Sequence, residues 1–443
     1  MTAIHIFSSG QDYFDHLDGL SAEGEMVEDV VRGIISRVRM EGDQALREYT
    51  ERFDGVRLED FRVPHTAIEE AVAYVDPAMR DVWIQAIDNI ERFHNRQREE
   101  SQLEFHDDGT VLGWKVTPVD RAGVYIPGGT AVYASSLLMN VIPARIAGVP
   151  RIVVVTPPGE NGLPHADILA CCALLEMEEV YAIGGAQAIA ALAYGTESIP
   201  HVYKITGPGN QYVAEAKRQV MGDVGIDSIA GPSEILILCD EPVEVEYLVR
   251  DLLSQAEHDA EARAVLITTD PGQARAVAER LEALIPQLPR RDIIEASFTG
   301  GSGIIVVPSL DEGLELVNDI APEHLEVLCP NPFALLNRIR NAGAIFLGPH
   351  TPEPVGDYFA GPNHTIPTGG RARFSSPLGV QDFIKRSSVI AYSPARLARE
   401  AGAIRRFAER EELFAHAEAV RVREAAPTAE SSTAPPSGSG GRP

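Results

Sequence analysis

Gln255 and His258 have the types and spacing of residues that could hold a metal or a substrate. They lie near the end of a helical pattern, 243–261, whose apolar residues recur every three to four positions. Side chains three residues apart are neighbours on one face of a helix. An amide and an imidazole so placed could share a metal or a substrate, although a solvated helix end explains them equally well.

Glu323 and His324 form a second candidate pair, and they directly follow Pro322. Proline suits the first position of a helix, which predicts that the pair lies at or beside a helix N-terminus. The positive end of the helix dipole disfavours an imidazolium, so His324 could stay neutral and accept a proton. A Glu–His dipeptide is common, however, and a purely structural role remains open for it.

The segment 348–368 is predicted to be a long loop without regular structure. It is rich in Pro and Gly and contains Asp357. Loops of this length inside a compact domain are usually functional. No spacing rule links Asp357, or the still more distant His416, to the helix that carries Gln255.

Three glycine-rich turns, 125–129, 184–187 and 207–210, each follow a predicted strand and open a predicted helix. Backbone N–H groups at such helix starts can bind an anion without basic side chains. The GxGxxG dinucleotide fingerprint is absent from the sequence. Each turn alone is explained as a tight strand-to-helix connection, whereas three in one unit make nucleotide binding about equally plausible.

The composition narrows the classes of partner. The 443-residue chain has 38 basic and 65 acidic residues and a formal charge of −27, which disfavours binding to nucleic acid or to an anionic membrane surface. Its four cysteines form no CxxC pair and are interpreted as reduced core residues. With no signal-like N-terminal segment and no apolar stretch of bilayer length, we expect a cytoplasmic protein.

The apolar patterning predicts an α/β fold with two consecutive Rossmann-like, parallel-sheet units between helical N-terminal and C-terminal regions. Strands are predicted at 123–126, 151–155, 180–183 and 201–205 in the first unit, and at 234–239, 264–268, 303–307, 325–328 and 344–347 in the second. A continuous helical pattern covers 395–423. A cleft between two such units is the default site.

These patterns divide the chain into five expected parts: a mainly helical region at 1–119, a first Rossmann-like unit with the glycine-rich turns at 120–232, a second Rossmann-like unit at 233–375, a helical segment at 376–425 and a disordered Ser/Pro/Gly-rich tail at 426–443.

The motifs taken together resemble the histidinol dehydrogenase family of histidine biosynthesis. The resemblance runs from the N-terminal helical region to about residue 422 and keeps the family's order of motifs. The motifs are YIPGG at 125–129, GGAQA at 184–188, GPGN at 207–210, AGPSE at 230–234, SQAEHD at 254–259, APEHLE at 321–326 and VGDYFAGPNH at 355–364.

The resemblance implies roles for individual residues. It implies Glu323 and His324 as the catalytic pair. The implied ligands of one Zn²⁺ per subunit are Gln255, His258, Asp357 and His416. Further implied substrate contacts are Ser233, His324 and Glu411, with His416 and Glu411 contributed by the other subunit of a homodimer. The implied NAD contacts are Tyr125, Gln187 and Asn210.

The chemistry that the resemblance implies is oxidation of L-histidinol to L-histidine in two hydride transfers to NAD, through a bound L-histidinaldehyde. Zinc is redox-inert, so its use is to hold and orient the substrate. Two alternatives are a thiol-based aldehyde dehydrogenase using Cys329 or Cys239, and a zinc hydrolase using the same ligands. Cys329 has no base near it in sequence, and a hydrolase leaves the three glycine-rich turns unexplained.

Overall fold

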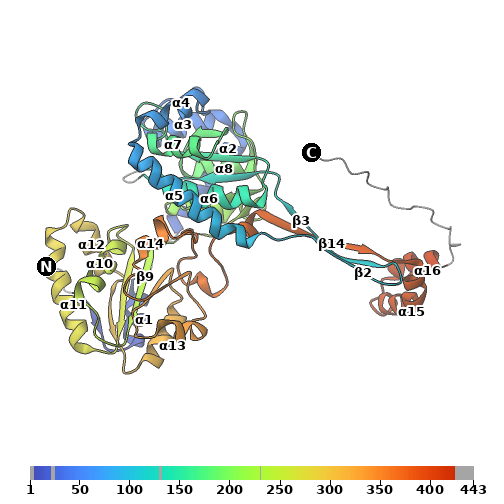
Figure 1. Ribbon diagram of the computed structural model, residues 1–443. Coiled ribbons are helices and arrows are strands. Elements are labelled where there is room, and N and C mark those ends of the chain that lie inside the picture. The colour runs from blue at the N-terminus through green and yellow to red at the C-terminus, as the bar shows by residue number, and fades with distance from the viewer. Residues whose placement is uncertain (1–3, 21–24, 129–131, 230, 425–443) are drawn as a thin grey trace. The chain divides into compact units, whose positions relative to one another are not determined.

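The computed structural model describes residues 4–20, 25–128, 132–229 and 231–424 (Figure 1). The tail predicted to be disordered, 426–443, lies outside these residues. The chain divides into two compact units: residues 1–98 with 118–384, and residues 99–117 with 385–443. In the described ranges, no helix is both long and apolar enough to cross a bilayer.

The first unit contains a five-stranded sheet with the strand order β6-β5-β4-β7-β8, and every strand pairing in it is parallel. Its central strands are runs of buried β-branched residues, as expected where helices cover both faces. The strands predicted in this region are found within a few residues of their expected limits. The bounds are β4 Ala122–Tyr125, β5 Ile152–Thr156, β6 Val180–Ala182, β7 Lys204–Thr206 and β8 Gly225–Ile226.

Helices cover both faces of this sheet because alternate strand residues point to opposite sides. Val153 and Val155 pack in one core with helices α2, α3, α8 and α9, whereas Val154 packs in a second core with α4, α5, α6 and α7. Much of the predicted N-terminal helical region therefore covers this sheet. The bounds are α2 Glu25–Glu41, α3 Asp43–Asp54, α4 His65–Ala71, α5 Pro77–His94, α6 Ala134–Ala147, α7 Ala166–Leu174, α8 Gly185–Tyr194 and α9 Gln211–Val220.

The same unit contains a six-stranded parallel sheet with the order β1-β11-β10-β9-β12-β13. Strand β1 lies in a region that the sequence predicts to be helical. It was missed because a strand of two residues is too short to show an alternating apolar pattern. The strands are β1 Ile6–Phe7, β9 Glu234–Cys239, β10 Arg263–Thr268, β11 Gly303–Val306, β12 His324–Val327 and β13 Ala344–Leu347. The helices are α1 Gly10–Gly19, α10 Val245–Ala256, α11 Pro271–Leu284, α12 Arg291–Thr299, α13 Leu310–Ile320 and α14 Glu353–Tyr358.

The second unit consists of a three-stranded sheet, ordered β14-β3-β2, and two helices packed against each other. The continuous helix expected over 395–423 is interrupted after Arg410. Glu412 adopts a left-handed backbone conformation (φ 60°), and the N–H of Leu413 turns back to the carbonyl of Ala408. The bounds are β2 Gln102–Phe105, β3 Val111–Pro118, β14 Ile384–Ala391, α15 Pro394–Arg410 and α16 Phe414–Glu424.

Candidate functional site

The three residues implied for NAD lie at the carboxyl edge of the five-stranded sheet. Tyr125 is the last residue of β4, Gln187 follows β6, and Asn210 follows β7. The chain adds β5 and β6 on one side of β4 and then places β7 on the other side. Tyr125 and Asn210 therefore flank the point where the strand order reverses. Nucleotides bind at this place in open parallel sheets.

The start of α8 is built around Tyr125 and Gln187. The hydroxyl of Tyr125 accepts a hydrogen bond from the N–H of Gly185 (3.1 Å). Gln187 is 1% exposed, and its Oε1 atom has no partner among the described residues. A Cβ atom on Gly185 would lie only 2.6 Å from that oxygen, which explains the glycine. The buried amide oxygen is therefore an acceptor left free at this turn.

The 207–210 turn is held by a buried ion pair. The pair is formed by Lys217 and Asp227, and both residues contact Gly207. Lys217 Nζ donates to the carbonyl of Gly207 (3.0 Å), and the N–H of Gly207 donates to Asp227 Oδ2 (2.8 Å). Asn210 begins α9 as its N-cap and accepts from two backbone N–H groups, so its amide nitrogen remains as a donor for a ligand. No sequence pattern pointed to the ion pair.

Glu323 and His324 do not lie at a helix N-terminus, contrary to the sequence prediction. His324 is the first residue of β12, and Pro322 precedes a strand. The pair lies at the amino edge of the six-stranded sheet, beside the start of β9, because His324 is in register with Ile235. The predicted strand at 325–328 was the correct interpretation of this segment.

Backbone groups of Glu234, at the start of β9, hold the side chains of both Glu323 and His324. Its N–H donates to Glu323 Oε2 (2.7 Å), and its carbonyl lies 2.9 Å from His324 Nδ1. Because a carbonyl can only accept, Nδ1 of His324 carries the proton. The other ring nitrogen, Nε2, is therefore the one available for chemistry, and it has no hydrogen-bond partner in the described part of the chain.

Burial raises the pKa of Glu323 to about 8, close to the range in which a carboxyl group works best as an acid or base near neutral pH. Burial alone would lower the pKa of His324, but Glu323, Asp357 and Glu353 outweigh it and raise it to about 10. The expectation of a neutral imidazole is therefore wrong for the protein alone. A cation bound beside Asp357 would oppose these carboxylates and favour the neutral form.

Gln255, His258 and Asp357 come from two segments of the six-stranded domain. Gln255 is 1% exposed in the last turn of α10, and its Oε1 atom lacks a hydrogen-bond partner among the residues described. His258 lies two residues past the helix end, and its N–H donates to the carbonyl of Gln255 (3.1 Å). Burial lowers the pKa of His258, which remains partly open to solvent, and the nearby Asp357 opposes this effect.

Asp357 lies on α14, a helix within the segment that was predicted to lack regular structure. Its Oδ1 atom is 3.7 Å from His324 Nε2. Burial raises the pKa of its carboxyl group, but His324 and His364 outweigh it and hold the pKa below its usual range. Asp357 therefore stays ionised next to His258, as a metal ligand must.

Glu353 was missed by the sequence analysis. Its Oε1 atom lies 3.9 Å from His324 Nε2, and it forms with His324 and Asp357 a group whose ligand atoms lie within 4.8 Å of one another. The spacing of Glu353 and Asp357, four residues apart, would have placed them on one face of a helix. The prediction of a loop hid this signal.

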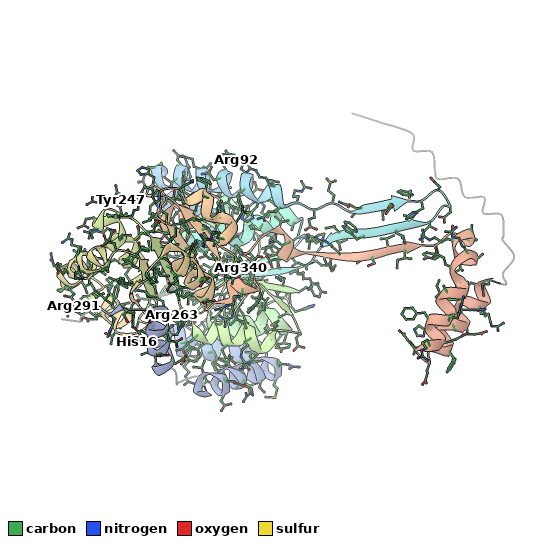
Figure 2. All side chains as sticks on the ribbon, turned by 90° about the horizontal axis from the view of Figure 1, so that it is seen from below. His16, Arg92, Tyr247, Arg263, Arg291 and Arg340 are labelled. Carbon is green, nitrogen blue, oxygen red and sulfur yellow. The ribbon has the colours of Figure 1, made fainter. Side chains whose placement is uncertain are left out.

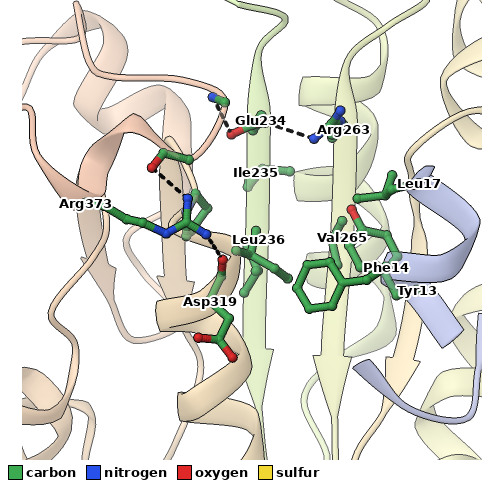
Figure 3. Close-up of a pocket in the computed structure, with 14 residues that line it drawn as sticks. Tyr13, Phe14, Leu17, Glu234, Ile235, Leu236, Arg263, Val265, Asp319 and Arg373 are labelled. Atoms are coloured by element: carbon green, nitrogen blue, oxygen red, sulfur yellow. Dashed lines mark hydrogen bonds and ion pairs between the residues drawn. The ribbon is translucent and has the colours of Figure 1, made fainter. Parts of the chain in front are cut away.

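A cavity of about 180 Å³ lies on the far side of Glu234 from the catalytic pair (Figure 3). The Glu234 carboxylate reaches it, accepts the N–H of Gly369 (3.2 Å) and lies 3.6 Å from the guanidinium of Arg263, which Figure 2 also labels. Ser233 precedes Glu234, and its carbonyl accepts from the N–H of Arg263 (2.9 Å). Ser233 thus lies at the same sheet edge as the catalytic pair.

The cysteines of the thiol alternative have the properties of core residues. Cys239 and Cys329 are free and buried. Burial raises the pKa of Cys239 to about 11, and burial beside Asp240 raises that of Cys329 further. A nucleophilic cysteine needs a lowered pKa, so this geometry disfavours attack by either thiol.

Glu411 and His416 belong to the second unit, where they line one groove of about 540 Å³. The groove is otherwise apolar and includes Phe407, which is 70% exposed, and Leu413, which is 43% exposed. The structure therefore brings together the two residues that the resemblance places in the site of the other subunit. The groove around them is an exposed apolar surface, which is typical of a site where another molecule binds.

Comparisons with known proteins place the chain in a family. The family model described as histidinol dehydrogenase matches residues 20–424. The histidinol dehydrogenase of Geobacillus kaustophilus is 53% identical over 393 residues, covering 89% of this chain and 93% of that protein. That of Bacillus subtilis is 51% identical over 416 residues, covering 94% and 97%. A crystal structure of histidinol dehydrogenase from Elizabethkingia anophelis superposes with a TM-score of 0.89 at 36% identity, covering 96% and 98%.

Proposed function

The chain belongs to the histidinol dehydrogenase family, and from this premise we propose that it oxidises L-histidinol to L-histidine through a bound L-histidinaldehyde, delivering one hydride to each of two NAD molecules. The observation that carries the proposal is the pairing of two features: a nucleotide-type turn with an unpaired buried acceptor on one sheet, and a His–carboxylate cluster on the other. We further propose a cytoplasmic location, which four free, buried cysteines suit.

Zn²⁺ fits the donors that Gln255, His258 and Asp357 offer. The unpartnered Oε1 of Gln255 needs an electron-pair acceptor, and the ionised Asp357 supplies negative charge beside a neutral imidazole. When bound, the metal would supply a redox-inert Lewis acid that holds the substrate imidazole and amine. One Zn²⁺ per subunit would take His416 of the other subunit as a further ligand.

NAD fits the carboxyl edge of the five-stranded sheet. The first turn of α8, after Gly185, and the turn before α9 offer backbone N–H groups, which can hold a pyrophosphate without basic side chains. Gln187 and Asn210 offer one free acceptor and one free donor. When bound, the cofactor would supply the hydride acceptor for both oxidations.

His324 acts as the base in both oxidations through Nε2, because Nδ1 is committed to the carbonyl of Glu234. In the first step it removes the hydroxyl proton as hydride leaves the carbinol carbon. Glu323 then takes a proton from the water that hydrates the aldehyde, and its pKa of about 8 suits this exchange near neutral pH. His324 removes the proton of the hydrate in the second oxidation.

The active form is proposed to be a homodimer in which His416 and Glu411 reach the site of the other subunit. The apolar groove that they line is the kind of surface that a second copy buries. An isolated subunit would then lack one metal ligand and bind zinc poorly.

The test of this function is an NADH absorbance assay with L-histidinol and NAD, before and after removal of metal by a chelator. We expect two NADH per histidinol, loss of activity on chelation and its return with zinc. Release of an organic acid or amine without NADH formation would favour the hydrolase alternative. Full activity of the metal-free protein would contradict the proposal.

Mixed dimers test the contribution of His416. His416→Ala and His258→Ala should each be inactive as homodimers. A mixed dimer of the two contains one site with both lesions and one site with neither, so activity should return on subunit exchange. Mixed dimers that form but remain inactive would show that His416 does not act across the interface.

A further inference from the structure

Glu326 is a buried acid that the proposed chemistry does not use. It is 1% exposed and lies on β12, two residues after His324. It is in register with Ile237 of β9 and Phe346 of β13, so the neighbouring strands carry apolar side chains at this level. A carboxyl group is costly to bury in such surroundings unless it is hydrogen-bonded, so its partners indicate what it is there for.

One oxygen of Glu326 completes the start of α14. Its Oε1 atom accepts the N–H of Glu353, the first residue of that helix (2.8 Å). Pro352, at the N-cap position, has no polar side chain that could accept this N–H, and Pro354 has no N–H of its own. Since a helix of this length is marginal in isolation, the bond from β12 helps to fix where α14 begins.

The same helix carries two groups that face His324. Glu353 Oε1 lies 3.9 Å and Asp357 Oδ1 lies 3.7 Å from His324 Nε2. His324 and Glu326 are alternate residues of one strand, so their side chains leave β12 on the same face. The hydrogen bond from Glu326 therefore ties α14 to the strand that carries His324, about one helical turn before Asp357.

The second oxygen of Glu326 faces α10, the helix that carries Gln255. Ile237, level with Glu326 on the adjacent strand, packs in one core with this helix. The side chain of Asp251, one turn before Gln255, forms a hydrogen bond with that of Glu326, which two carboxyl groups can do only by sharing a proton. Burial and the charge of Asp251 raise the pKa of Glu326 well above its usual range, so Glu326 holds this proton.

We propose that Glu326 is a positioning residue for the metal site: its two hydrogen bonds fix α14 relative to β12 and α10, so that Asp357 faces His324 and the zinc-binding side chain of Gln255. The proposal rests on the proposed binding of Zn²⁺. Glu326 acts through α14 and is not itself a proposed ligand. Residues that orient the ligands of a metal commonly change its affinity as strongly as a ligand does.

The test is a zinc titration of the metal-free, full-length protein in competition with a chromophoric chelator. Glu326→Leu removes both hydrogen bonds and should weaken zinc binding by about tenfold or more. Glu326→Gln keeps an acceptor for the N–H of Glu353 and gains a donor for Asp251, so it should bind zinc within about threefold of the wild type. Rescue by glutamine separates this role from a general need for an acid at this position.

Asp270→Ala is the matched control for loss of stability. Asp270 is the N-cap of α11, which packs against the same six-stranded sheet, and its Oδ1 atom accepts the N–H of Gly272 (2.7 Å). Removing this cap should lower the midpoint of thermal unfolding. It should leave zinc affinity unchanged, because α11 carries none of the proposed ligands.

A second pair of variants tests the hydrogen bond itself, including the case in which Glu326→Leu fails to fold. Glu353→Ala and Glu353→Pro both lose the side chain, but only proline lacks the N–H that Glu326 accepts. Proline is well tolerated at the first position of a helix. Glu353→Pro should therefore bind zinc about tenfold more weakly than Glu353→Ala.

Three results would overturn the proposal: zinc binding by Glu326→Leu as tight as in the wild type, zinc binding by Glu326→Gln as weak as in Glu326→Leu, or equal zinc affinities of the two Glu353 variants. A wild-type protein that binds no zinc would instead overturn the proposed function.

Discussion

The buried ion pair of Lys217 and Asp227 offers a quantitative test of how the nucleotide-type turn is held. The two side chains are only 2% and 4% exposed, so neither charge is compensated by water. Lys217→Met removes the cation and leaves the Asp227 carboxylate with only the N–H groups of Gly207 and Ser228 as donors. Breaking a buried pair from one side costs about 3–5 kcal/mol, so we expect the free energy of unfolding to fall by that amount.

Neutralising both partners should recover part of this loss. In Lys217→Met/Asp227→Asn no buried charge is left unpaired, and the asparagine oxygen can still accept the N–H of Gly207. The double variant should therefore be less destabilised than the sum of the two single variants, with a coupling energy of about 2 kcal/mol or more. Urea unfolding followed by fluorescence of Trp83, a buried residue of α5 in the core on one face of this sheet, reports on the sheet. A Trp114→Phe background removes the other tryptophan.

Arg218→Met is the matched control, because it removes one positive charge from the next position of the same helix. Arg218 pairs with Glu215 at the surface, where its side chain is 45% exposed, and such pairs contribute about 0–1 kcal/mol. The reasoning would be refuted if Lys217→Met cost no more than this control. NAD⁺ affinity should fall in Lys217→Met and not in Arg218→Met, because only Lys217 holds Gly207.

Four further predictions concern the proposed chemistry. His324→Asn should keep zinc and substrate binding but lower kcat of both oxidations by about 10²–10⁴-fold in stopped-flow NADH assays, the usual contribution of a general base; a normal first oxidation would contradict its role. Glu323→Gln should mainly slow oxidation of added histidinaldehyde, so a variant that fails only on histidinol would show that the roles are wrongly assigned. Asp357→Ala and His258→Ala should lose zinc by elemental analysis while circular dichroism stays unchanged. Cys329→Ser should remain active, and a folded but inactive variant would revive the thiol route.

Local sequence patterns were sufficient for the longer strands of the two parallel sheets and for the succession of these two sheets along the chain, but the strands β2, β3 and β14 lie in regions that were predicted to be helical. The segment 234–239 was predicted and found with the same limits, because a fully buried parallel strand needs an unbroken apolar run that is visible without any tertiary contact. The two-residue β1 was not predicted, and neither was α14, since Pro and Gly around a six-residue helix produce the composition of a loop. The motifs at 254–259 and 321–326 were sufficient to indicate the family.

The tertiary structure alone decided the environment of the catalytic residues. In the sequence, Pro322 favoured a helix start and therefore a neutral His324. In the fold, the register of β12 with β9 places His324 at the amino edge of the sheet, beside the carboxylates of Glu353 and Asp357 on α14. Glu323, its neighbour in sequence, raises the pKa of His324 together with Asp357 and Glu353, to about 10. No local pattern encodes the last two contributions, because Asp357 and Glu353 approach only after the sheet forms. The unpaired oxygens of Gln187 and Gln255 became visible for the same reason, since whether a polar atom lacks a partner depends on every segment that folds around it.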